Sequence, residues 1–301
     1  MASMTDDDLA TAPLVFRADL FRGQTVLVSG AGSGLGKATA VLFARTGARL
    51  AICGRKPDKL EACATLLRGL GAEVSVHPMS IRDPDQVDAL MTDVWARHGT
   101  LDILVNNAGG QFPQAAIDFS VKGWNAVIDT NLTGTWHMMQ AAARRWREAE
   151  RPGSIANVVA VVWRGMPGIA HTCAARAGVI YLSKTVATEW APLGIRVNCV
   201  APGVIETEGM AVYPEEARRA LPGSNPMRRA GRATDVADAI AYLSGPSGGF
   251  VTGEVLVVDG GGQNWGDLWT VPRPAWFSDP VGLPSVPAQK SVASKLRAPG
   301  H

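Results

Sequence analysis

A glycine-rich stretch near the N-terminus has the residue types and spacing to bind a phosphate. Its sequence is Ser29-Gly30-Ala31-Gly32-Ser33-Gly34-Leu35-Gly36, between a β-branched run and a helical pattern. Glycines at positions 30, 34 and 36 permit a tight turn, close approach of a pyrophosphate, and packing of helix on strand, while the helix N-terminus supplies free N–H groups. We expect Ser33, Gly34 and Leu35 to contact a nucleotide; the alternative is an ordinary strand-to-helix loop.

The end of the next expected strand favours one kind of nucleotide. A site that prefers NAD carries Asp or Glu here, which accepts hydrogen bonds from the ribose. This chain has Ile52-Cys53-Gly54-Arg55-Lys56, with no acid and two cations. Arg55 can make a bidentate contact with a ribose 2′-phosphate, and Lys56 can add a point charge. The sequence therefore favours NADP(H); the alternative is a solvated pair that begins the next helix.

Short β-branched runs alternate with longer helical patterns along the chain. Because parallel neighbouring strands need a crossover helix, this alternation predicts an α/β fold, a doubly wound parallel sheet of the Rossmann type in a single domain. The helices begin at Leu35 and Pro57, among other places, and the expected strands lie at 25–28, 50–52, 74–76, 103–105, 155–158, 195–198 and 255–258.

Composition changes divide the chain into three expected regions. An N-terminal arm covers 1–19, the NADP(H)-binding domain covers 20–262, and a C-terminal tail covers 263–301. The domain includes a substrate loop at about 207–230, whose pattern does not indicate a substrate. Prolines interrupt regular structure in the tail, while its aromatic residues favour burial on this or a neighbouring subunit. A disordered tail is the alternative.

Overall charge and composition favour a small-molecule substrate. The 301 residues carry a formal net charge of +2, with 19% charged residues, so nucleic acid and membrane surfaces are not expected partners. The four cysteines have no paired spacing, which indicates neither a disulfide framework nor a metal site. Three aspartates stand where a signal peptide needs positive charge, and no apolar run approaches about 18 residues. We expect a cytoplasmic protein.

Further motifs complete a recognisable pattern. They are Asn106-Asn107-Ala108-Gly109, Asn131 within 130–134, and Pro202-Gly203-Val204-Ile205 followed by Thr207. With the glycine-rich loop they resemble the short-chain dehydrogenase/reductase family over residues 20–262. Within that family, segments 107–112, 122–124, 171–178 and 198–205 are similar to the peroxisomal trans-2-enoyl-CoA reductases.

The resemblance implies roles for residues beyond the glycine-rich loop. Asn107 and Gly109 would line the channel for adenosine and ribose, and Ser80 and Ile81 would lie against the adenine ring, where many relatives have Asp-Val. The nicotinamide would be held by Pro202, Gly203, Val204 and Thr207.

The resemblance also shows a departure at the catalytic positions. Relatives that reduce carbonyls have Ser, then Tyr thirteen positions later, then Lys four beyond that; here these positions hold Val159, Thr172 and Arg176. Tyrosine has a reference pKa of about 10, which an adjacent cation can lower until the side chain is a usable acid. The pKa of a threonine hydroxyl cannot be lowered far enough in this way. Arg176 can bind the nicotinamide ribose but is a poor proton relay. Ordinary ketone or alcohol chemistry is therefore not expected.

Reduction of an enoyl thioester, such as an enoyl-CoA, fits these residues better. Hydride goes to the β-carbon, and the enolate oxygen needs hydrogen-bond donors, among which Asn131 and Thr172 are candidates. The α-carbon proton comes from water or a side chain, with His171 and Tyr213 as candidates. The alternatives are a capped or packed histidine at the helix start and a tyrosine on a surface loop. One alternative is a pathway-specific oxidoreductase of a non-thioester substrate. Another is a catalytically silent NADP(H)-binding sensor or scaffold.

Two other expectations concern the helix at 172–190. Tyr181 and Lys184 have the wrong spacing for the family's Tyr-Lys couple, and Tyr181 lies about 13 Å along the helix from Thr172 at ~1.5 Å per residue. We expect them to be packing or subunit-contact residues. The apolar surface of this helix, and the similarity of 251–261 to the family's last strand at subunit boundaries, predict a homodimer or homotetramer.

Overall fold

The computed structural model describes residues 3–212, 215 and 221–264. The chain clusters into two compact units, Met1–Trp265 and Gly266–His301. Every described residue belongs to the first unit. Tyr213 and the tail from Trp265 onward, for which the sequence made predictions, lie outside the described residues.

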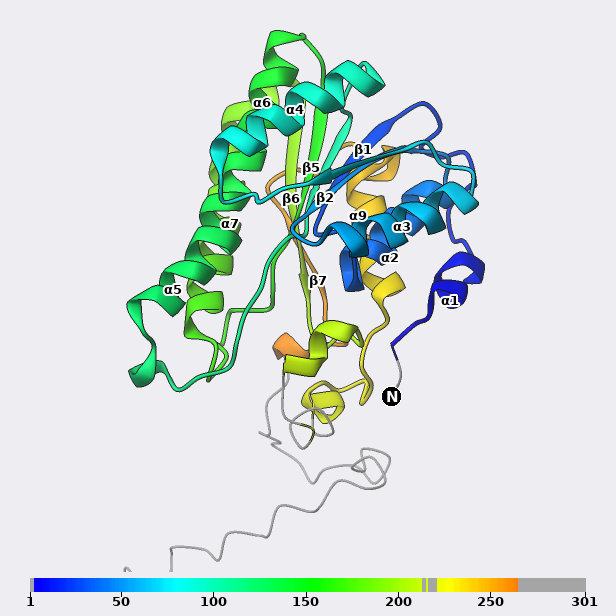
Figure 1. The fold of residues 1–301 in the computed structure, drawn as a ribbon. Helices are drawn as coiled ribbons and strands as arrows, with labels where there is room; N and C mark the ends of the chain where they lie inside the picture. The colour runs from blue at the N-terminus through cyan, green and yellow to red at the C-terminus, as the bar shows by residue number, and fades with distance from the viewer. Residues whose placement is uncertain (1–2, 213–214, 216–220, 265–301) are drawn as a thin grey trace, which may run out of the picture. The chain divides into compact units, whose positions relative to one another are not determined.

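A parallel sheet forms the centre of the first unit (Figure 1). Its 7 strands have the order β3-β2-β1-β4-β5-β6-β7, and all neighbouring strands are parallel. The predicted α/β fold is confirmed, and each expected strand falls within an observed one. The strands are β1 (Thr25–Ser29), β2 (Arg49–Gly54), β3 (Val74–Pro78), β4 (Ile103–Asn106), β5 (Gly153–Val158), β6 (Ile195–Pro202) and β7 (Val255–Val258).

Helices cover both faces of the sheet. One buried cluster joins α2, α3 and α9 to the sheet, and a second joins α4, α6 and part of α7. Both faces must be covered because the crossovers of a parallel sheet place helices on each side. The α-helices are α1 (Asp6–Thr11), α2 (Gly34–Arg45), α3 (Pro57–Gly69), α4 (Pro84–His98), α5 (Val121–Ile128), α6 (Gly134–Glu148), α7 (Ala170–Trp190) and α9 (Ala233–Ser244).

Strand order determines where a ligand can bind. The chain runs outward from β1 through β2 to β3, then returns to β4 on the other side of β1. Loops at the carboxyl ends of β1 and β4 therefore separate to opposite faces, and the crevice between them is the usual ligand site of such sheets. The glycine-rich loop follows β1, and Asn107 follows β4.

Local structure differs from the sequence expectations in three places. The helix after β1 begins at Gly34 rather than Leu35, and the long helix begins at Ala170, before Thr172. The N-terminal arm contains α1, which begins with a capping box in which Thr5 and Asp8 bond each other's backbone N–H groups. No helix among the described residues is long and apolar enough to cross a membrane.

Candidate functional site

The loop after β1 requires its glycines. Gly30 has a φ of 67°, and a Cβ atom there would lie 2.9 Å from Ala108 Cα. A Cβ at Gly36 would lie 2.3 Å from the Gly30 carbonyl oxygen, so α2 packs directly on the turn. Gly36 serves this packing and does not line the pocket, whereas Gly30, Gly34 and their neighbours do.

A pocket of about 840 Å³ opens beside this loop. It brings together most of the residues that the sequence proposed for the coenzyme: Gly30, Ser33, Gly34, Leu35, Arg55, Lys56, Ser80, Ile81, Asn107, Gly109, Arg176, Pro202, Gly203, Val204 and Thr207. Their roles toward a coenzyme stay predictions. Segments far apart in the sequence thus converge on one pocket at the carboxyl edge of the sheet.

The pocket is strongly cationic. Its described lining includes Arg55, Lys56, Lys59, Arg82, Arg164 and Arg176, against one acidic residue, Asp259. The Asp259 carboxylate accepts hydrogen bonds from the backbone N–H groups of Gly261 and Gln263. Such a lining suits a ligand with several negative charges.

Three of the pocket cations gather at the start of α3. Arg55 and Lys56 precede the helix, and Lys59 lies one turn further along. Sequence reasoning missed Lys59, although a spacing of three to four residues places a side chain on the same helix face. The helix N-terminus adds its own positive potential at this end of the pocket.

Val159, Thr172 and Arg176 line the same pocket at the ends of β5 and α7. The resemblance assigned these three to the family's catalytic positions, and the structure places them together. Their neighbours in the lining are largely apolar: Val161, Met166, Ile169 and Met210. The lining of this pocket can therefore hold an apolar chain as well as hydrogen-bonding groups.

Arg176 is a buried cation without a described protein partner. It is 8% exposed, and no described residue forms a hydrogen bond or ion pair with its guanidinium. Burial lowers the pKa of Arg176 to about 10, so the group is charged at neutral pH. A buried, unpaired charge is costly. Its place on the pocket wall indicates that a polar or anionic ligand completes its contacts.

Asn131 lies behind the pocket wall rather than in it. Its side chain accepts a hydrogen bond from Gly110 N at 3.0 Å and donates one to Gly110 O at 3.0 Å. Asn131 belongs to a π-helical segment, Asp129–Thr133, between α5 and α6, and π turns are frequent at functional sites. Both amide atoms are engaged with the backbone, so the structure does not present Asn131 as the expected oxyanion donor.

His171 also does not line the pocket. Its ring centroid lies 4.7 Å from that of Phe112 and 4.4 Å from that of Phe119, and the residue is fully buried. Desolvation lowers the pKa of His171, which favours the neutral ring at pH 7. The structure therefore gives His171 a packing environment away from the pocket, which does not favour a role as proton donor.

Other candidates lie away from the pocket. Tyr181 is 70% exposed, Lys184 Nζ lies 5.3 Å from the centre of its ring, and neither residue lines the pocket. Their assignment as packing or subunit-contact residues stays a prediction. Among the described residues, no group of three or more His, Cys, Asp or Glu side chains could hold a metal ion.

With this geometry in place, sequence comparison gives the family. A family model described as enoyl-(acyl carrier protein) reductase matches residues 30–263. The chain belongs to the short-chain dehydrogenase/reductase family. Within this family it is 37% identical to the 3-oxoacyl-[acyl-carrier-protein] reductase FabG of Thermotoga maritima over 240 residues, which cover 79% of this chain and 97% of FabG.

Two further short-chain dehydrogenase/reductase relatives extend the comparison. A probable 2,4-dienoyl-CoA reductase of Bacillus subtilis is 34% identical over 243 residues, covering 79% of this chain and 96% of the relative. The solved structure of the citronellol catabolism dehydrogenase AtuB from Pseudomonas aeruginosa PAO1 superimposes with a TM-score of 0.75 at 39% identity, covering 83% of this chain and 98% of AtuB. Relatives of this family are oxidoreductases, and this chain is therefore placed among them.

Proposed function

We propose that the protein is an NADPH-dependent reductase that saturates the conjugated double bond of an enoyl thioester, such as an enoyl-CoA. The observation that carries this proposal is that Val159, Thr172 and Arg176, which the family resemblance assigns to the catalytic positions, line the same pocket. Reduction of a ketone needs a proton donor for the carbonyl oxygen. Valine has no such group, and the pKa of a threonine hydroxyl cannot be lowered to near 7 by its surroundings.

Conjugate reduction requires less of these side chains. Negative charge develops on the thioester oxygen, where hydrogen-bond donors stabilise it. The Thr172 hydroxyl and the Arg176 guanidinium are the donors that α7 offers in this pocket, and the α-carbon then takes its proton from water. The apolar lining formed by Val161, Met166 and Ile169 accommodates the acyl chain.

The pocket residues fit a dinucleotide coenzyme, which supplies a hydride from its nicotinamide ring when bound. The glycine cradle at Gly30 and Gly36 leaves no room for a Cβ atom. The Gly34 backbone lies at the α2 N-terminus, where an N–H group can face a pyrophosphate. The cations Arg55, Lys56 and Lys59 bind the 2′-phosphate in this proposal, which gives the preference for NADPH over NADH.

Two relatives support a thioester substrate. The names of the Thermotoga and Bacillus proteins specify a 3-oxoacyl thioester of acyl carrier protein and a dienoyl-CoA. The first is reduced at a C=O group and the second at a conjugated C=C system. In this proposal Val159, Thr172 and Arg176 hold the three catalytic positions, and the absence of a tyrosine among them favours the second type of reaction.

A matched pair of thioesters tests the proposal. Crotonyl-CoA and acetoacetyl-CoA have the same acyl length but offer a C=C bond and a C=O bond, respectively. We expect NADPH absorbance to fall with crotonyl-CoA and not with acetoacetyl-CoA. Turnover of acetoacetyl-CoA instead would overturn the proposal. If the protein reduces enones that lack a thioester and reduces neither thioester, it is a different oxidoreductase. If it binds the coenzyme and reduces none of these compounds, it is a silent binding protein.

A further inference from the structure

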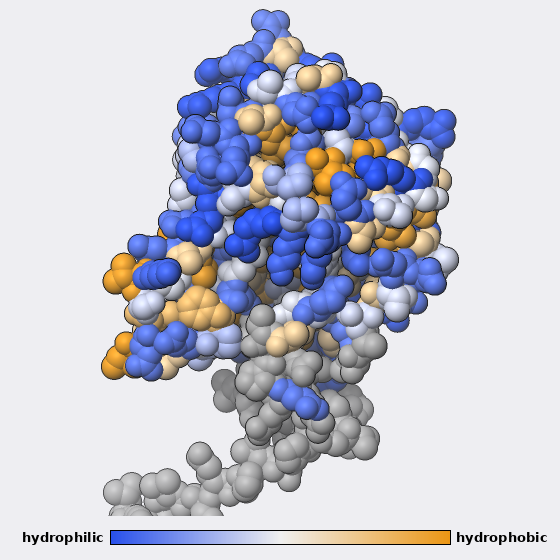
Figure 2. Space-filling model, viewed as in Figure 1, coloured by the Kyte–Doolittle hydropathy of each residue, from blue (hydrophilic) through white to orange (hydrophobic). Residues whose placement is uncertain are grey.

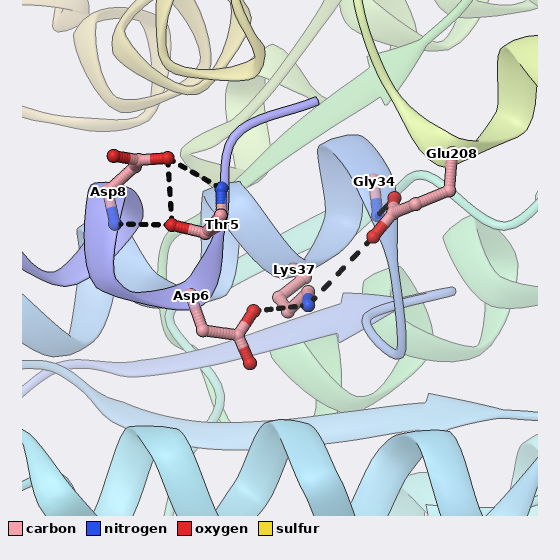
Figure 3. Close-up of polar contacts among 6 residues, drawn as sticks. All are labelled: Thr5, Asp6, Asp8, Gly34, Lys37 and Glu208. Carbon is pink, nitrogen blue, oxygen red and sulfur yellow. Dashed lines mark hydrogen bonds and ion pairs between the residues drawn. The ribbon is translucent and has the colours of Figure 1, made fainter. Parts of the chain in front are cut away.

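Glu208 contacts the part of the glycine-rich loop where a pyrophosphate would bind. It begins the short 3-10 segment η4 (Glu208–Val212), directly after Thr207. Its Oε2 accepts a hydrogen bond from Gly34 N at 3.0 Å (Figure 3). Gly34 is the first residue of α2, so this N–H is one of the free donors of the helix. A carboxylate of the chain itself therefore occupies an anion-binding donor.

One lysine lies beside Glu208 and is shared with a second carboxylate. Oε1 of Glu208 lies 4.0 Å from Lys37 Nζ. The same ammonium group lies 2.5 Å from Asp6 Oδ1 (Figure 3). Asp6 belongs to α1, outside the residues 30–263 that match the family model. Because Asp6 contacts Lys37 independently of Glu208, the cation stays beside the loop when Glu208 moves.

Glu208 and a pyrophosphate cannot both use the Gly34 amide. Two anions at one donor repel each other, and each N–H makes a single strong hydrogen bond. Binding of a dinucleotide at the proposed site therefore requires the Glu208 carboxylate to leave.

We propose that Glu208 is a coenzyme-displaced latch that links the dinucleotide site to the part of the pocket wall formed by Gly209 and Met210. The residues after Glu208 are Gly209 and Met210, and both line the pocket. In this proposal, displacement of Glu208 shifts the adjoining backbone that carries Gly209 and Met210. If bound coenzyme changes the affinity for substrate by some factor, thermodynamic linkage requires that bound substrate changes the affinity for coenzyme by the same factor. This inference rests on the proposed dinucleotide site.

Calorimetric titration with NADPH tests the latch directly. Without the competing carboxylate, Glu208→Ala should bind NADPH about 3- to 10-fold more tightly, because a charge-assisted hydrogen bond at a half-exposed position is worth a modest amount. Glu208→Gln should show a smaller gain, since its amide oxygen still accepts from Gly34 N. Adenosine 2′-monophosphate, which lacks the pyrophosphate, should bind all variants equally. Glu148→Gln, on the exposed end of α6, is the matched surface control.

Two results would overturn the latch: unchanged or weaker NADPH binding in Glu208→Ala, or equal tightening for adenosine 2′-monophosphate. Failure of the proposed function is distinguishable from these. If the wild type binds NADPH but reduces no enoyl thioester, the titrations still decide the latch because they involve no turnover. If the wild type prefers NADH, the same titration is made with NADH, since both coenzymes contain the pyrophosphate. Absence of binding by either coenzyme overturns both proposals.

Discussion

A Cβ atom at position 109 would lie 2.2 Å from Nη2 of Arg176, so the glycine backbone and the guanidinium are in direct contact. The same Cβ would lie 3.1 Å from Oδ1 of Asn131. Asn131 in turn holds both backbone groups of Gly110. The segment after β4 and the first turns of α7 therefore form one unit, in which the position of the buried cation depends on the absence of a side chain at 109.

Gly109→Ala should displace the Arg176 guanidinium and weaken NADPH binding by about tenfold, because hydrogen bonds to charged groups contribute about 1.5–3 kcal/mol. Gly110→Ala is the matched control, since a Cβ there meets nothing within 4 Å. Calorimetric titration of both variants measures the effect. Equal losses in the two variants would mean that general disturbance of the loop, rather than the position of Arg176, determines binding.

Arg55→Ala should weaken NADPH binding by about tenfold or more while leaving NADH binding nearly unchanged, because only NADPH carries the 2′-phosphate that a guanidinium can contact in a bidentate manner. Arg68→Ala is the control at the far end of α3, the helix that Arg55 precedes, where Arg68 pairs with Glu61 at 3.5 Å. Parallel losses for the two coenzymes in Arg55→Ala would remove the 2′-phosphate assignment.

His171→Phe should retain the aromatic packing against Phe112 and Phe119 and leave the pH profile of the rate unchanged. Burial lowers the pKa of His171, so the unfolded chain binds more protons and this residue reduces stability as pH falls below about 6.5. Urea unfolding at neutral and acidic pH should therefore show a smaller acid-dependent loss in His171→Phe than in the wild type. Loss of an acidic limb from the rate profile in this variant would restore His171 as a proton donor.

Self-association is a further prediction, supported by exposed apolar side chains. Figure 2 shows apolar surface over the region of α5. Val121, the first residue of α5, is 77% exposed, and Ile117, four residues earlier, is 93% exposed. Exposed apolar patches of this kind often mark protein interfaces. Light scattering should give the mass of a dimer or tetramer. The mass of a single chain at micromolar concentration would contradict the prediction.

The sequence predicted the sheet, its strands and most of the pocket because these depend on local patterns. Each of these patterns lies within a few residues of sequence: the periodicity of a strand, the glycines after β1 and the cations after β2. The side-chain positions of Asn131 and His171 depend instead on residues distant in the sequence. The backbone of Gly110 is hydrogen-bonded to the amide of Asn131, and Phe112 and Phe119 pack against the ring of His171. No local pattern indicates such tertiary contacts.

The contact made by Glu208 could not be predicted from the sequence either. Its contact with Gly34 joins positions 174 residues apart, and nothing in the spacing of either segment indicates it. Lys59 was within reach of sequence reasoning because it lies one helical turn beyond Lys56. The general position of the pocket follows from strand order, whereas the particular side chains that enter it depend on loop paths that only the structure provides.

The fate of the coenzyme hydrogen tests the central claim most directly. The protein is given crotonyl-CoA and NADPH deuterated at the transferred position of the nicotinamide ring, and the product is analysed by NMR and mass spectrometry. Conjugate reduction predicts butyryl-CoA with the deuterium on the β-carbon and a hydrogen from water on the α-carbon. No reduction of crotonyl-CoA, together with transfer of deuterium to the carbonyl carbon of acetoacetyl-CoA, would contradict the account.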